Sequence, residues 1–170
     1  MDQFDPQIPG LMEGDVTSVA VTDPQPFVGG VGNHVIDPSK SFDLKVEWEV
    51  FGQLEPIWVG SLDDNWDVSV YAESLGGGPE ILIANAQVPK ANVLPCTVNG
   101  TQPNCAKYST TLTVAPNTLP EHDPNSNQSG IYKLAAAVFL NSSIVPSPGS
   151  PGFDLIGFSE GPIIQAENPE

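Results

Sequence analysis

The chain has 170 residues, and its 21 acidic side chains outweigh five lysines and no arginine, giving a formal net charge of −16. Binding to a phosphate backbone requires clustered basic side chains, so this composition excludes nucleic acid as the expected partner and disfavours anionic membrane surfaces. No run of about 18 apolar residues is present, so we expect no membrane insertion. The length fits one domain with arms better than two small domains.

Residues 1–14 are predicted to form an extended N-terminal arm. Four apolar side chains stand here among prolines and glycines without a helical or a strand period, and proline prevents continuous strand pairing. The four are Phe4, Ile8, Leu11 and Met12. They need a surface to lie on, which either the body of the same chain or a neighbouring protein supplies.

Alternation of apolar and polar residues predicts about seven strands in the part of the chain that follows. The clearest strand spans 41–52, where five large apolar side chains share one face, and 65–74 repeats the pattern with Trp66 among its inward residues. The other predicted strands are 15–22, 80–88, 107–115, 129–140 and 153–164. Turn-forming Gly, Pro and Asn residues separate them, and no stretch shows the spacing of an amphipathic helix.

This pattern is typical of an all-β chain folded as an antiparallel two-sheet sandwich, which we assign to residues 15–164. The strand 41–52 is expected to supply about half of the core, since burying each large apolar side chain contributes on the order of 1.5–3 kcal/mol before entropy is counted. The acidic residues 165–170 are expected to form a loose C-terminal tail.

The strand 129–140 follows a run of turn formers, and from Gly130 it reads Gly-Ile-Tyr-Lys-Leu-Ala-Ala. A turn followed by Gly-x-Tyr-x-Leu-x-Ala resembles the E–F corner and F strand of immunoglobulin-like sandwiches. The resemblance implies an immunoglobulin-like topology in which the Tyr132 hydroxyl bonds to the preceding backbone, but no particular function, because this fold serves many. Antibody-type domains carry a cysteine where Leu134 stands, so other sandwich topologies such as a jelly roll stay open.

Cys96 and Cys105 flank a loop rich in turn formers, so the two thiols can meet, and we predict a disulfide between them. By loop entropy such a bond would contribute ~2–3 kcal/mol to stability. It would indicate an oxidising compartment, which favours an extracellular or cell-surface location, although the N-terminus lacks the pattern of a secretory signal. The alternative is two unpaired thiols in a cytosolic loop. A metal site is not expected at this pair, since no further cysteine or nearby histidine completes it.

The second face of the strand 129–140 is apolar for a side that would meet solvent. It carries Ala135, Ala137 and Phe139. Small residues beside an aromatic ring suit close contact with another surface. That surface belongs either to a partner protein, to a second copy of the chain, or to the arm or a long loop of the same chain.

Catalytic motifs are lacking, and the two histidines lie in separate loops, so we predict a chain without enzymatic activity. Three carboxylates, Asp63, Asp64 and Asp67, lie close together in the sequence and offer the oxygen ligands that Ca²⁺ prefers. Their spacing is not that of an EF-hand, and an ordinary acidic turn is the alternative. Trp58 and Tyr71 are the aromatic residues that a carbohydrate site would use.

We therefore expect a structural or interaction module that binds a protein partner or self-associates as a subunit or accessory of a larger assembly. Its expected contact elements are the apolar strand face and the N-terminal arm. The rival expectation is a β-sandwich module that binds carbohydrate or Ca²⁺, and no other cofactor is expected.

Overall fold

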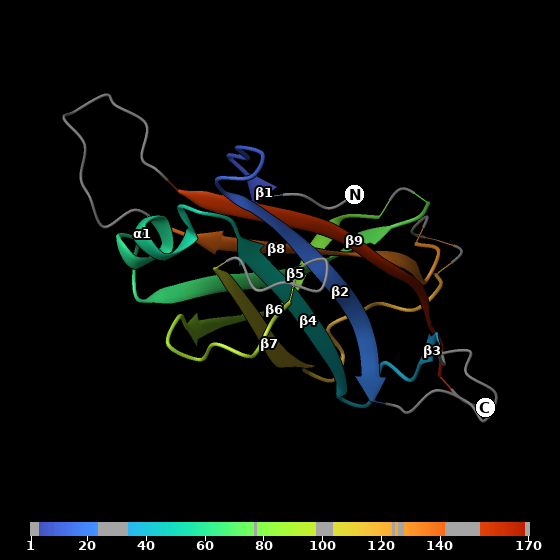
Figure 1. Ribbon diagram of the computed structural model, residues 1–170. Coiled ribbons are helices and arrows are strands. Elements are labelled where there is room, and N and C mark those ends of the chain that lie inside the picture. The colour runs from blue at the N-terminus through green and yellow to red at the C-terminus, as the bar shows by residue number, and fades with distance from the viewer. Residues whose placement is uncertain are drawn as a thin grey trace.

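The computed structural model describes residues 4–23, 34–76, 78–97, 104–123, 125, 128–141 and 154–168. Nearly all regular structure within these residues is strand, with one short helix (Figure 1). The elements in chain order are β1 (Phe4–Asp5), β2 (Glu13–Asp23), β3 (Val35–Ile36), β4 (Phe42–Phe51), α1 (Glu55–Gly60), β5 (Asn65–Ser74), β6 (Glu80–Pro89), β7 (Cys105–Val114), β8 (Ile131–Leu140) and β9 (Leu155–Ala166).

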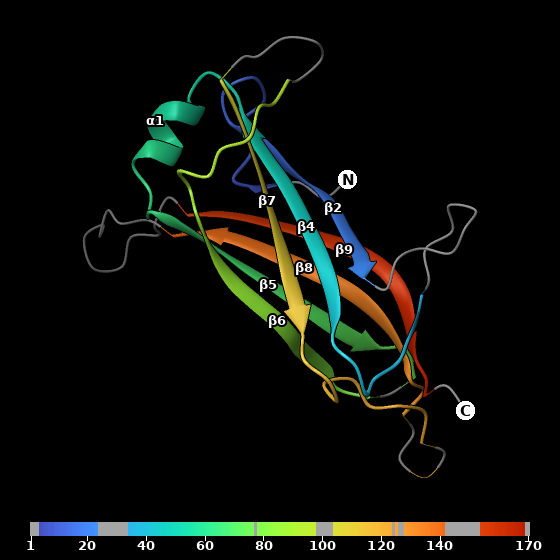
Figure 2. The ribbon, with the colours of Figure 1, turned by 90° about the horizontal axis from the view of Figure 1, so that it is seen from below.

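Two sheets face each other and enclose one core (Figure 2). The larger sheet has the strand order β1-β9-β8-β5-β6, with β3 beside β9, and the smaller sheet has the order β2-β4-β7. All pairs are antiparallel except the short pair of β3 with β9. The predicted all-β two-sheet sandwich is confirmed, and the described strands number nine because the short β1 and β3 extend the larger sheet.

The strand order is compatible with an immunoglobulin-like sandwich, whose A, B and E strands lie in one sheet and whose C, F and G strands lie in the other. The order β2-β4-β7 of the smaller sheet is compatible with strands A, B and E. The order β5-β8-β9 within the larger sheet is compatible with strands C, F and G. The buried Tyr132 hydroxyl donates a hydrogen bond of 2.7 Å to the carbonyl oxygen of Pro120, as the resemblance implies. Burial raises the pKa of the Tyr132 phenol, so it stays a proton donor.

Tyr132→Phe is expected to lower the free energy of unfolding by about 1–2 kcal/mol, because it removes the donor and leaves the Pro120 carbonyl without its partner. Urea titration measures the loss. Tyr71→Phe removes the same hydroxyl from the outward side of β5 and is the control, with an expected change within about 0.5 kcal/mol. Equal losses in the two variants would contradict the stabilising role of the Tyr132 hydrogen bond.

An aromatic cluster joins the two sheets at the centre of the core. Trp48 of β4 and Trp66 of β5 come from opposite sheets, are fully buried, and meet edge to face with ring centroids 5.9 Å apart. The Tyr108 ring of β7 stacks on Trp48 at 5.5 Å, and the Phe4 ring of β1 meets Trp66 edge-on at 5.8 Å. The burial of β4 and β5 follows the alternation that their sequences predict.

The expected N-terminal arm is instead part of the sandwich. Phe4 and Met12 keep only 2% and 1% of their surface exposed, and β2 begins within the segment expected to be an arm. Phe4 pairs with Gly157 of β9 and fills the space that a side chain would take, since a Cβ atom at Gly157 would lie 2.6 Å from its ring. The chain's own body therefore supplies the surface for Phe4 and Met12, whereas Ile8 and Leu11 each stay 37% exposed.

Two other segments differ from the expectation. Gln165 and Ala166, expected in the loose tail, are the last residues of β9 and pair with β3. The helix α1 lies where a link without helix was expected. It has six residues with a proline in its first turn, so it is too short for an apolar period to show in the sequence. Among the described residues, no helix is long and apolar enough to cross a membrane.

Candidate functional site

The larger sheet presents apolar side chains on the face opposite the core. Residues alternate in direction along β8, so Ala135, Ala137 and Phe139 point outward while their neighbours are buried. The register of β8 with β9 places Ile156 opposite Phe139 and Phe158 opposite Ala137. Side chains directly opposite each other on one face are in contact range, so these five form one contiguous area.

The area continues across β5 and β6. Tyr71 of β5 lies opposite Ala135, and Leu82 of β6 lies opposite Tyr71. Phe158 keeps 53% of its surface exposed, Leu82 49% and Ile156 46%, so the described part of the chain leaves them open to solvent. We call these seven residues the outer apolar patch: Tyr71, Leu82, Ala135, Ala137, Phe139, Ile156 and Phe158.

The sequence pattern does not predict that Ile156 and Phe158 of the patch point outward. The inward positions of β9 next to them carry Gly157 and Ser159, which are small, while the large side chains stand at the outward positions. A small residue is needed inside because the Phe4 ring lies on Gly157. Apolar alternation alone would therefore assign this part of β9 the wrong face, and only its register with β8 identifies the outward residues.

Acidic side chains border the outer apolar patch. Asp67 and Glu73 of β5 and Glu160 of β9 are exposed on the same face. Glu80 of β6 lies opposite Glu73 and is exposed as well. The ammonium group of Lys133, which lies on the outward side of β8, is 3.0 Å from the Glu160 carboxylate. Four acids against one lysine give this rim a negative charge.

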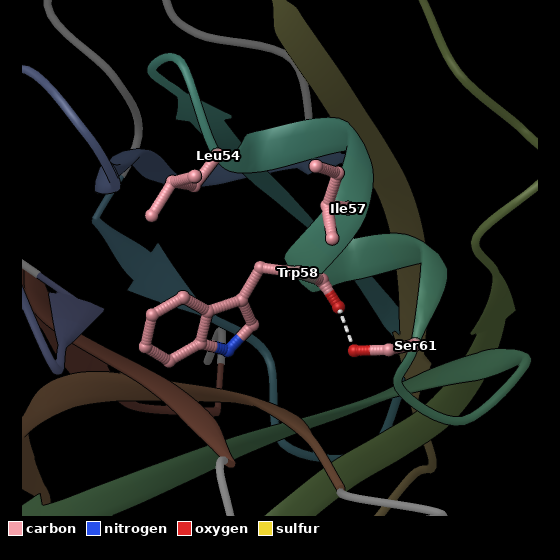
Figure 3. A pocket seen from close by; sticks show the side chains of 4 residues that line it. All are labelled: Leu54, Ile57, Trp58 and Ser61. Carbon is pink, nitrogen blue, oxygen red and sulfur yellow. Dashed lines mark hydrogen bonds between the residues drawn. The ribbon is translucent and has the colours of Figure 1, made fainter.

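A second apolar feature lies beside α1, where Trp58 was expected to bind a ligand. Leu54, Ile57, Trp58 and Ser61 line a pocket of about 230 Å³ (Figure 3). Ile57 keeps 73% of its surface exposed, and the Trp58 side chain packs partly against the core. The Ser61 hydroxyl donates to the Trp58 carbonyl at 2.7 Å, so the pocket wall offers mainly apolar surface. Tyr71 lies on the sheet and does not line this pocket.

Lys90 fixes the C-terminal end of α1 and thereby one side of this pocket. Its ammonium group donates to the carbonyl oxygens of Leu62, Val59 and Gly60 at 2.6, 3.0 and 3.5 Å. The Asp64 carboxylate lies 3.9 Å from the same group. A cation is favourable here because the last carbonyls of a helix carry partial negative charge and lack helical partners.

The three acids expected to bind Ca²⁺ are not brought together. The Asp67 carboxylate accepts a hydrogen bond of 3.0 Å from the Gln87 side-chain amide, and the Asp64 side chain is 96% exposed beside Lys90. Within the described ranges, Asp63, Asp64 and Asp67 form no group whose oxygen atoms all lie within 4.8 Å of one another. The geometry thus gives the expectation of a calcium site here no support.

Cys96 and Cys105 form a disulfide, with their Cα atoms 5.7 Å apart, which confirms the bond expected from the sequence. The bond joins the first residue of β7 to the segment that follows β6. It therefore links one strand of the smaller sheet to the connection that arrives from the larger sheet.

Glu55 is a carboxylate at the first position of α1 with only 8% of its surface exposed. Burial raises the pKa of its carboxyl group. The pKa of the buried Tyr108 phenol is also raised, chiefly by burial and further by the charge of Glu55. Glu55 thus lies buried near enough to Tyr108 of the aromatic cluster for its charge to affect the phenol.

Glu55→Gln is expected to raise the melting temperature at pH 7 and to leave it unchanged below pH 4.5, the ordinary pKa of the group. Because the folded pKa is raised, the folded chain binds the proton more tightly than the unfolded chain, and wild-type stability falls as pH rises from 4.5 through the folded pKa. The uncharged amide of Gln at position 55 does not titrate, so the variant does not lose this stability as pH rises. Calorimetric scans of both chains across pH check this, and a less stable variant at pH 7 would show that the carboxylate is a net stabiliser.

No family model matches the chain. No curated protein matches it either. Among solved structures, it is similar to a bacterial adhesin from Mobiluncus mulieris that contains intramolecular disulfide, isopeptide and ester bond cross-links, with a TM-score of 0.38 and 12% identity. The match covers 92% of this chain and 57% of that chain, so this chain spans little more than half of the length of the adhesin structure. A likeness at this level carries no argument about function.

Proposed function

We propose that the chain is a non-catalytic interaction module that docks onto another protein through the outer apolar patch. The observation that carries this proposal is the exposure of Leu82, Ile156 and Phe158 on one face of one sheet. Large apolar side chains gathered on one face and bordered by charges are typical of protein-binding surfaces.

The composition of the patch suits a tight contact around Phe158. This ring lies opposite Ala137, and the next outward residue along β8 is Ala135, so two small side chains stand beside it. Small side chains allow a partner to approach the strand closely and to bury the aromatic ring. Buried aromatic residues near the centre of an interface carry a large share of its binding energy.

The acidic rim favours a partner with lysine or arginine side chains around an apolar centre. Two copies of this chain would bring Asp67, Glu73 and Glu160 against the same acids, and each copy carries a net charge of −16. Like charges placed together across an interface are destabilising, so self-association through the patch is disfavoured. Light scattering should therefore give the mass of a single 18.0 kDa chain.

Phe158→Asp is expected to abolish capture of the partner from an extract of the source cells. Binding would bury the new carboxylate without a paired cation at the centre of the contact, which is costly. Tagged wild-type and variant chains are compared by quantitative mass spectrometry of the bound proteins. Thr111→Asp places the same charge at an exposed position of β7 on the smaller sheet and should retain the partner.

The same experiment contradicts the proposal if one protein is recovered equally by the wild-type and Phe158→Asp chains. It also does so if Thr111→Asp alone loses the bound protein, which would move the contact to the smaller sheet. A partner held through the rim should further bind less tightly as salt concentration rises, because exposed charge pairs are screened.

We also propose that the sandwich belongs to the immunoglobulin-like class and acts in an oxidising compartment. The hydrogen bond from Tyr132 to Pro120, the buried Trp66 on β5 and the strand order support the class. The bond between Cys96 and Cys105 supports the compartment.

A ligand-binding module is the second candidate, favoured by the pocket beside α1. Its walls of Leu54, Ile57 and Trp58 suit an apolar ligand better than a sugar, because few polar groups line it. Binding on a glycan array that Trp58→Ala removes would support the carbohydrate version. A melting temperature that chelator leaves unchanged would count against the calcium version.

A further inference from the structure

A carboxylate lies beside the disulfide on the outer side of the smaller sheet. Glu49 points outward from β4, and its Oε2 atom is 3.9 Å from the sulfur of Cys96. A Glu49 oxygen and the two sulfur atoms of Cys96 and Cys105 all lie within 4.8 Å of one another. Side chains from three separate segments thus direct one oxygen and two sulfurs to a common point.

The backbone holds these three side chains close together independently of the disulfide bond. Glu49 and Cys105 belong to β4 and β7, which pair along ten successive positions. The segment of Cys96 is tied to β7 two residues earlier, where the Leu94 amide donates to the Lys107 carbonyl at 2.8 Å. Cys96 itself is only 6% exposed. We therefore expect the three side chains to stay close together when the disulfide is reduced.

The site is open to solvent on one side. Both cysteines line a cavity of about 400 Å³, together with Val93, Leu94, Pro95 and Asn104. Such a cavity supplies an entry path for an ion and space for a water ligand. Lys107 lies opposite Glu49 in the sheet but directs its ammonium group to Glu47, at 3.6 Å.

We propose that the reduced chain binds Zn²⁺ through the thiolates of Cys96 and Cys105 and the carboxylate of Glu49, with water as the fourth ligand. Zinc accepts sulfur and carboxylate ligands in tetrahedral sites, and thiolates select it over Ca²⁺ or Mg²⁺. No histidine or third cysteine is needed, because Glu49, 47 positions before Cys96, completes the set. The sequence offers no sign of this partner.

The bond and the metal are alternative states of the same residues. A dithiol reductant breaks the S–S bond, leaves one electron and one proton on each cysteine sulfur, and is itself oxidised to a disulfide. Zn²⁺ then displaces the two thiol protons as it binds. Two thiolates on a tetrahedral zinc stand about 3.8 Å apart, which suits side chains whose Cα atoms are 5.7 Å apart.

The test is a titration of the full chain with Zn²⁺ in competition with a colorimetric chelator. The chain is first reduced with a dithiol that is then removed by gel filtration under argon. Reduced wild type should bind one Zn²⁺ per chain, and oxidised wild type should bind none at this site. Glu49→Gln should weaken binding about tenfold or more, since loss of a ligand costs at least as much as loss of an outer-shell partner.

Asp43→Asn is the matched control, because it removes one negative charge from another outward position of β4, leaves Glu47 in place to hold the Lys107 ammonium group, and should leave the affinity unchanged. The proposal fails if reduced wild type binds Zn²⁺ no more tightly than the oxidised chain. It also fails if Glu49→Gln and Asp43→Asn weaken binding equally, which would show a general charge effect. Circular dichroism checks that each reduced chain is folded. The proposal is also overturned if the reduced wild type unfolds and does not regain structure when Zn²⁺ is added.

Discussion

Trp48→Ala is expected to lower the free energy of unfolding by about 3–5 kcal/mol. Trp48 is fully buried in β4, touches Trp66 of the opposite sheet and stacks on Tyr108 of its own sheet. Alanine would leave a cavity between the sheets and remove a ring contact from both neighbours. Because domains of this size are commonly stable by about 5–15 kcal/mol, the variant should lie close to unfolding at room temperature. Guanidinium titration followed by far-ultraviolet circular dichroism measures the loss.

Phe158→Ala is the control for this prediction, since it removes an aromatic ring from the outside of the same sandwich. Phe158 is 53% exposed, so the free energy of unfolding should change by no more than about 0.5 kcal/mol. A loss close to that of Trp48→Ala would contradict the placement of Phe158 on an open face.

Gly52→Ala is expected to cost about 2–4 kcal/mol of stability, the second largest effect. Gly52 has a φ of +125°, and a Cβ atom there would lie 2.4 Å from the backbone oxygen of Leu11. That same oxygen accepts a hydrogen bond of 2.8 Å from the amide of Leu54, just before α1. Relieving the clash would therefore separate the N-terminal turn from the start of the helix. Thermal unfolding of the variant measures the cost.

Gly10→Ala separates the cost of a positive φ from the cost of the clash with the Leu11 backbone. Gly10 also has a positive φ, +75°, but a Cβ atom there would meet nothing within 4 Å. Only the conformational penalty remains, about 1 kcal/mol. If Gly10→Ala and Gly52→Ala destabilise equally, the close approach of Leu11 to Gly52 has no energetic weight.

Alternation along β4 and β5 was enough to predict the centre of the core. Trp48 and Trp66 stand in strands where polar and apolar residues alternate over most of the length, and both are fully buried. The resemblance of the turn and Tyr132 to an immunoglobulin-like E–F corner implied a hydrogen bond to the preceding backbone, and the structure identifies the acceptor as the carbonyl oxygen of Pro120. Two cysteines around a short polar loop likewise predicted their own bond.

The outer apolar patch could be predicted only in part. Ala135, Ala137 and Phe139 share one strand, and their spacing alone places them on one face. Ile156 and Phe158 join them through pairing between β8 and β9, and the small inward residues of β9 hide their direction. Strand register is a property of the whole sheet, so a single strand's sequence does not contain it.

The burial of the N-terminal residues and the position of Glu49 depend on tertiary contacts in the same way. Phe4 is buried because Gly157, far along the chain, leaves space for its ring. Glu49 reads as an ordinary outward residue of a strand until the connection carrying Cys96 is placed over it. Conversely, Asp63, Asp64 and Asp67 are near in sequence, yet within the described residues their carboxylates do not gather into one group.

Calorimetric titration of the purified partner with wild-type and Phe158→Asp chains is the most direct test of docking through the outer apolar patch. Phe158→Asp should lose at least about 2 kcal/mol of binding free energy, roughly thirtyfold in Kd, as expected for an aromatic residue at the centre of an interface. Thr111→Asp should bind as wild type does. Equal dissociation constants for the wild-type and Phe158→Asp chains would show that the partner binds elsewhere on the molecule.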